Sequence, residues 1–111
     1  MVSDWTLVEA ASALALKVRT GQLTAAHARS VRSQIGAWTD ESFEVVTVER
    51  DAFQAATRLL DRPSTALRAG DALHLAIAET RGATLVTLDR ALATEAAAVG
   101  VAVDVPAGPD A

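Results

Sequence analysis

The stretch GDALHLAIAETRGATLVTLDRAL, residues 70–92, decides the fold of this chain. Residues 71–81 are predicted to form a helix, and Gly82 follows at the position where a glycine commonly ends one. The run 83–88, ATLVTL, shows no polar alternation, which predicts a strand buried on both faces. A helix over 89–99 comes next. A helix, a strand and a second helix joined by short links indicate an α/β fold.

The segments on either side continue this alternation. Residues 4–19 and 24–38 predict two helices joined by a tight turn, and the first is apolar on nearly all sides, so we expect it to be buried. Residues 43–48, FEVVTV, predict a strand because they are β-branched and short, and a helix follows over 49–61. The last strand is expected in 101–105. Such an order is typical of a parallel sheet covered by helices.

Composition limits the classes of protein that remain. The chain has 111 residues, of which 50% are apolar, so we expect one domain over 1–104 and a flexible tail over 105–111. The lack of cysteine excludes disulfide scaffolds, thiolate zinc sites and cysteine nucleophiles. Since no apolar run approaches the roughly 20 residues that span a bilayer, we expect a soluble, cytoplasmic protein without a membrane partner. A net charge of −4 means that a nucleic-acid partner would need a local basic strip or metal ions.

Two aspartates stand where helices are predicted to begin. Asp71 comes directly after Gly70, and Asp89 comes directly after the strand predicted over 83–88. Ligands of an open parallel sheet bind beyond the carboxyl ends of its strands, where Asp89 is expected to lie. Aspartate is also among the best helix caps, so the two residues are either caps or half of a metal site.

Glu9 is the acid that favours a metal site, because its neighbours in the predicted helix are almost all apolar. An unpaired buried carboxylate costs several kcal/mol or takes up a proton. The alternative is a capping box between Thr6 and Glu9, which would hold the glutamate near the surface. Three acids near helix starts suit Mg²⁺ or Mn²⁺, which would activate a water or stabilise a phosphodiester oxygen.

Histidine and the basic residues are weaker candidates. His74 lies three residues after Asp71 on one helix face, yet a lone histidine in an apolar segment is more often a packed residue. Five cations could contact phosphate groups, although a solvated helix face explains them equally well. They are Lys17, Arg19, Arg29, Arg32 and Arg68.

Three motifs together resemble PIN-domain proteins, specifically the VapC-type toxins of type II toxin–antitoxin pairs. SDWTLVEAASALALKVRTGQL (3–23) resembles the glutamate-bearing helix of that family and the turn after it. LRAGDALHLAIA (67–78) resembles the family's central aspartate motif. GATLVTLDRALATEAAAVGV (82–101) resembles its last aspartate motif and closing strand. The three segments cover most of the chain in the family's order.

The resemblance implies a PIN-like three-layer α/β/α sandwich with a parallel sheet, over 1–104. It implies an endoribonuclease that depends on Mg²⁺ or Mn²⁺ and cleaves structured RNA such as tRNA. Glu9, Asp71 and Asp89 match the positions of the family's catalytic and metal-binding acids. It further implies a homodimer and inhibition by a cognate VapB-like antitoxin that covers the active site.

The sequence departs from the family pattern at its start. The family begins with a strand that ends in an aspartate, followed by a helix, and we expect both to be missing here, a loss of roughly 30 to 40 residues. Only Val2 and Ser3 remain of a strand ahead of the helix at residue 4, and Asp4 does not replace the missing acid. The departure leaves open a catalytically inactive remnant that binds an antitoxin or a sister toxin. A flavodoxin-like or response-regulator-like binding domain is disfavoured, because those domains place paired acids after an early strand.

Overall fold

A computed structural model describes residues 1–63 and 65–106 of the chain. The chain divides into two compact units, a first unit of residues 1–48 and a second unit of residues 49–111. Among the described residues, no helix combines the length and the apolar character needed to cross a membrane. From residue 107 onward, the tail predicted over 105–111 lies outside the described residues.

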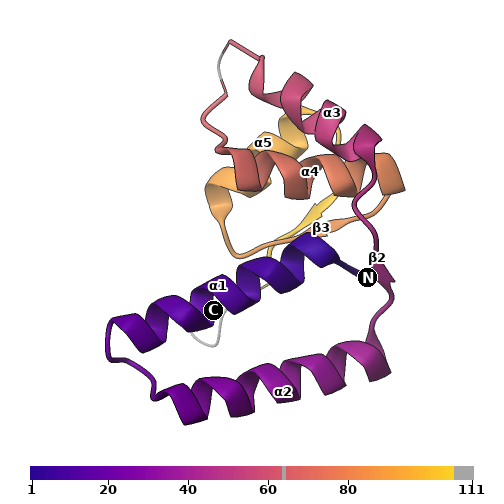
Figure 1. The fold of residues 1–111 in the computed structure, drawn as a ribbon. Helices are drawn as coiled ribbons and strands as arrows, with labels where there is room; N and C mark the ends of the chain where they lie inside the picture. The colour runs from indigo at the N-terminus through magenta and orange to yellow at the C-terminus, as the bar shows by residue number, and fades with distance from the viewer. Residues whose placement is uncertain (64, 107–111) are drawn as a thin grey trace. The chain divides into compact units, whose positions relative to one another are not determined.

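The first unit is built on a helical hairpin of α1 (Asp4–Arg19) and α2 (Ala25–Ser42), which pack side by side (Figure 1). Gly21 has a φ of 77°, a conformation that glycine adopts without strain, and it allows the chain to reverse between the helices. Thr24 caps α2, because its hydroxyl accepts a hydrogen bond from the backbone N–H of His27 at 3.0 Å. The predicted helix pair and its tight turn are confirmed.

The two ends of the hairpin carry a short parallel pair of strands. β1 (Val2–Ser3) pairs with β2 (Val45–Val46). Val46 is 3% exposed, so this pair contributes to the core of the unit. The prediction that Val2 and Ser3 belong to a strand ahead of α1 is confirmed.

An aromatic pair closes the carboxyl end of α2. Trp38 lies in the last turns of the helix, and Phe43 is the residue at which the helix ends. Their ring centroids are 4.8 Å apart with an interplanar angle of 89°, an edge-to-face arrangement that aromatic rings prefer. Trp38 is otherwise largely exposed.

The prediction that α1 is buried is wrong. Leu14 is its only buried residue, whereas Val8 and Leu16 are more than half exposed. Alanine and leucine favour a helix through their backbone and rotamer preferences, and these preferences do not require burial. The helix packs mainly on α2 and β1 within the unit, which cover only part of its surface.

The second unit contains three helices and the other pair of strands. Its elements follow the chain as α3 (Arg50–Leu60), α4 (Ala69–Arg81), β3 (Leu85–Val86), α5 (Arg90–Ala98) and β4 (Val103–Asp104). β3, α5 and β4 form a βαβ unit, because the two strands are parallel and neighbours in one sheet. The predicted helix-rich α/β fold with parallel strands is therefore confirmed, with one two-stranded sheet in each unit.

Helix α4 is the centre of the second unit and packs against α3. Leu75 is fully buried at 0% exposure, and alanines of both helices are buried as well. The buried residues of α4 are Ala72, Leu73, Leu75, Ala76, Ile77 and Ala78. The expectation that the strand over 83–88 is buried on both faces is wrong, since Val86 is 61% exposed. An unbroken apolar run thus indicates a strand here without indicating two covered faces.

Glu95 of α5 ties down the link between α3 and α4. Its carboxylate accepts hydrogen bonds from Arg62 Nη1 at 3.3 Å, from Thr65 Oγ1 at 3.5 Å and from the backbone N–H of Ala66 at 3.3 Å. The Glu95 side chain is 17% exposed, so these bonds are partly shielded from water. Three donors on one carboxylate hold the link against α5.

Glu95→Gln is expected to lower the free energy of unfolding by about 1 to 2 kcal/mol, because the amide loses the charge and one acceptor oxygen. Urea unfolding followed by far-UV circular dichroism measures the change. Glu79→Gln makes the same chemical change at an exposed position of α4 and should stay within about 0.5 kcal/mol of the unmodified chain. Equal effects of the two substitutions would show that the bonds to the link add nothing.

Candidate metal centre

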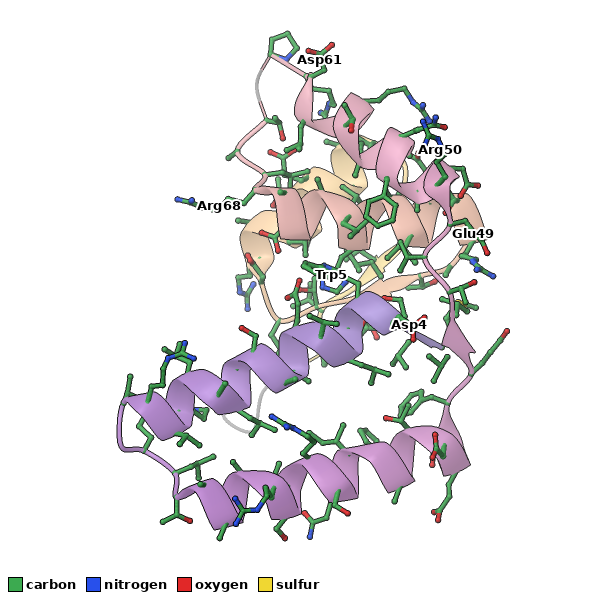
Figure 2. All side chains as sticks on the ribbon, viewed as in Figure 1. Asp4, Trp5, Glu49, Arg50, Asp61 and Arg68 are labelled. Atoms are coloured by element: carbon green, nitrogen blue, oxygen red, sulfur yellow. The ribbon has the colours of Figure 1, made fainter. Side chains whose placement is uncertain are left out.

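Asp71 lies in the first turn of α4 and does not cap it. The helix begins at Ala69, two residues earlier than predicted, and Arg68 is its N-cap with an extended backbone (Figure 2). Capping, one of the two roles left open for Asp71, is therefore wrong. Its side chain is half-buried, and the described part of the chain offers its carboxylate no hydrogen bond or ion pair. A carboxylate held on a helix without a protein partner is available to a ligand.

Asp89 is the N-cap of α5, one of the two roles left open by its sequence position. Its Oδ1 accepts hydrogen bonds from the backbone N–H groups of Ala91 at 2.9 Å and Leu92 at 3.2 Å. Its own N–H donates to Thr87 Oγ1 at 3.0 Å, which orders the turn that leads into the helix. Both capping bonds end on Oδ1, so the cap does not use Oδ2. Capping and metal binding are therefore compatible roles for this exposed side chain.

The second unit brings Asp71 and Asp89 to one end. After α4, about 20 Å long, the chain turns at Gly82 and returns through 82–88, which span about 23 Å when extended. The return brings the carboxyl end of β3 back to the side on which α4 begins (Figure 1). Both aspartates thus occupy the end of the unit where α4 and α5 start.

A fourth acid, which the sequence analysis did not single out, lies at the carboxyl end of β4. Asp104 is in register with Val86, and its carbonyl oxygen accepts a hydrogen bond from the N–H of Thr87 at 3.1 Å. Parallel strands end at the same edge of a sheet, so Asp104 borders the turn that leads to Asp89. Asp104 could have been found from the sequence, because it is an acid near the end of the strand predicted over 101–105.

Glu9 differs from both expectations drawn from its sequence context. Ser3 caps α1 by accepting a hydrogen bond from the N–H of Thr6 at 3.2 Å, so the helix begins before Thr6 and the proposed capping box is wrong. Glu9 is also exposed, so the argument from a buried carboxylate does not hold. It belongs to the first unit, whereas Asp71 and Asp89 belong to the second.

The donor set suits a hard divalent cation. Within residues 1–63 and 65–106, no three acidic, histidine or cysteine side chains are gathered as a metal-binding group. Mg²⁺ is commonly held through one or two carboxylates, keeps several waters and takes further oxygen ligands from phosphates. The carboxylate of Asp71, which has no partner among the residues that the structure describes, and the Oδ2 of Asp89 are oxygen donors of that type.

Comparison with models of protein families identifies a PIN domain over residues 1–97. The chain belongs to the PIN-domain family. Comparisons with curated proteins and with solved structures find no match. PIN domains are generally nucleases that typically use a divalent metal, so the family resemblance noted in the sequence is confirmed at this level. The matched part of this PIN domain contains Glu9, Asp71 and Asp89, whereas Asp104 lies after it.

Proposed function

We propose that this PIN domain is a metal-dependent endoribonuclease and the toxin of a type II toxin–antitoxin pair, of the VapC type. The observation that carries the proposal is the position of Asp71 and Asp89 at one end of the second unit in a chain of the PIN family. Structured RNA such as tRNA is the proposed substrate. A homodimer and a VapB-like antitoxin that covers the acids complete the proposal, which for these partners draws on the motif resemblance.

Asp71 and Asp89 would hold Mg²⁺ or Mn²⁺, and Glu9 is the third proposed acid. When bound, such a cation lowers the pKa of water and stabilises the negative charge that develops on a phosphodiester. The protein itself positions the two carboxylates. Helix α4 carries Asp71, and the two N–H groups at the start of α5 fix the orientation of Asp89. Side chains held on regular helices keep a site more precise than side chains on loops.

The test is cleavage of end-labelled tRNA by the purified chain with Mg²⁺, with Mn²⁺ and with a chelator. We expect fragments from a limited set of positions with either metal and none with the chelator, because the carboxylates alone do not supply the cation's charge. Cleavage that persists in chelator would contradict metal dependence. Absence of cleavage with both metals would contradict the nuclease proposal for this chain. Induced expression tests the toxin assignment separately, through arrest of growth.

A further inference from the structure

Charge is unevenly distributed along the hairpin of the first unit. All of its lysine and arginine residues lie in the last turn of α1 or in the amino-terminal half of α2, and we call this group the basic tip: Lys17, Arg19, Arg29 and Arg32. The acids of the unit are Glu9, which lies partway along α1, and four residues at the opposite end of the hairpin: Asp4, Asp40, Glu41 and Glu44. Asp4 marks that opposite end in Figure 2.

Along each helix, the nearest acid is eight residues from the basic tip. Glu9 precedes Lys17 by eight residues on α1, and Asp40 follows Arg32 by eight residues on α2, so each separation is about 12 Å. The Debye length at physiological ionic strength is about 8 Å. No acid lies between Lys17 and Arg32 in the chain, so this part of the hairpin concentrates four positive charges although the chain as a whole carries −4.

None of the four cations is engaged by an acid in the described part of the chain. All four side chains are exposed. Arg19, Arg29 and Arg32 have no hydrogen-bond or ion-pair partner there. Lys17 donates from Nζ to Oε1 of Gln22 at 3.2 Å, and this neutral partner leaves its charge uncompensated. The basic tip is thus free to meet an anionic surface.

Favourable interaction with the helix dipole explains the positions of only two of the four cations in the basic tip. Lys17 and Arg19 lie in the last turn of α1, where the helix dipole favours cations. Arg29 and Arg32 lie in the amino-terminal half of α2, where the dipole offers cations no benefit, and the first turn of α2 contains no acid. The positive end of α2 instead adds to the potential of the tip.

We propose that the basic tip contacts the sugar–phosphate backbone of RNA. The inference rests on the proposed nuclease function and adds a substrate-binding surface on the unit that does not contain Asp71 and Asp89. Arg29 and Arg32 are three residues apart on α2, so they share one face of the helix with Cβ atoms about 5 to 6 Å apart. Their planar guanidinium groups match phosphate oxygens in a bidentate manner.

The experiment measures binding of the full chain to a fluorescent, structured RNA in chelator, so that binding is observed without cleavage. Fluorescence anisotropy is recorded between about 0.05 and 0.2 M salt. Arg29→Gln/Arg32→Gln is expected to weaken binding about 10- to 30-fold at physiological salt, because two phosphate contacts are lost. The slope of log K against log salt should become shallower by about 1.4 to 1.8.

Arg50→Gln/Arg58→Gln is the matched control on α3. It removes the same charge from exposed helical positions, but acids adjoin α3 at both ends, among them Glu49 and Asp61 (Figure 2). The control should change binding less than about threefold, since no concentrated charge is removed. Equal losses in the two double variants, or no loss in either, would overturn the proposal.

Two further measurements complete the experiment. The first distinguishes a loss of charge from a loss of folding, and the second distinguishes RNA from other anionic surfaces. Arg29→Lys/Arg32→Lys keeps both charges but loses the bidentate geometry, so it should bind RNA more tightly than Arg29→Gln/Arg32→Gln and keep the salt slope of the unmodified chain, which a variant that perturbs the fold would not. Vesicles of anionic phospholipid replace the RNA in the second measurement. Loss of vesicle binding together with unchanged RNA binding in Arg29→Gln/Arg32→Gln would overturn the RNA assignment in favour of a membrane surface.

Failure of this inference differs from failure of the nuclease proposal. If the unmodified chain cleaves RNA with Mg²⁺ and Arg29→Gln/Arg32→Gln binds RNA equally well, the role of the tip is refuted and the nuclease stands. If the chain binds RNA through the tip and cleaves none, the nuclease is refuted and the tip stands.

Discussion

Asp71→Asn is expected to lower the rate of RNA cleavage by at least about 100-fold, a loss of about 3 kcal/mol of transition-state stabilisation. Asparagine keeps the shape of the side chain and removes the negative charge that a divalent cation requires. The half-buried carboxylate of Asp71 has no partner in the described residues, so its replacement breaks no bond of the fold there. Cleavage rates at saturating Mg²⁺, measured beside the unfolding free energy, test this expectation.

Glu79→Gln is the control for Asp71→Asn, because Glu79 is an exposed acid toward the other end of α4. It should leave the cleavage rate unchanged within about twofold, since exposed charges far from the site contribute little. A cleavage rate for Asp71→Asn equal to that of this control would refute the role assigned to Asp71.

Two substitutions of Asp89 separate its capping role from its proposed metal role. Asparagine is also a good N-cap, so Asp89→Asn should abolish most cleavage with little change in stability. Asp89→Ala removes the acceptor of two backbone N–H groups and should cost about 1 kcal/mol in addition. If Asp89→Asn cleaves RNA normally and only Asp89→Ala fails, the residue is a cap and no more.

Leu75→Ala is expected to lower the free energy of unfolding by about 3 kcal/mol, the largest stability effect predicted for this chain. Leu75 is fully buried in the helix that forms the centre of the second unit. Truncation therefore loses apolar burial and leaves a cavity where the side chain stood. Urea unfolding by far-UV circular dichroism measures the loss.

Leu88→Ala serves as the matched control for Leu75→Ala. Leu88 is 76% exposed, so the same truncation should change the free energy of unfolding by less than about 0.5 kcal/mol. A small effect at Leu75 would mean that the second unit repacks around the missing side chain.

The helices were the most predictable part of the fold. Glycine and capping residues carry their conformational preferences in their own covalent structure, so Gly82 and Thr24 could be assigned from the sequence. The capping role left open for Asp89 followed from the same kind of preference. Parallel pairing followed from the order of elements, because strands joined through helices return in the same direction.

Burial and exact helix starts were less predictable. The exposure of Val8 and Val86 depends on which elements cover them, and local sequence does not contain that information. The start of α4 at Ala69 was missed because aspartate in a first turn and aspartate at a cap have similar sequence surroundings.

In the second unit, the sequence predicted the two acids Asp71 and Asp89 of the candidate site and missed Asp104, the third acid at that end. Asp71 and Asp89 were found because each follows a clear helix or strand signal. Asp104 emerged only from strand register, which pairs residues far apart in the chain. Glu9 was selected by its apolar neighbours, a criterion that fails for an exposed alanine-rich helix. Its assignment as a site residue now rests on the family motif.

The aromatic pair of Trp38 and Phe43 lies in the unit that holds both tryptophans of the chain, and this location has a spectroscopic consequence. The chain has two tryptophans and no tyrosine, and both Trp5 and Trp38 belong to the first unit. Intrinsic fluorescence therefore arises from side chains of the first unit, whereas far-UV circular dichroism reports on the helices of both units. Coincident urea midpoints from the two signals would show that the units lose their structure in one cooperative step. An earlier midpoint in either signal would identify which unit opens first.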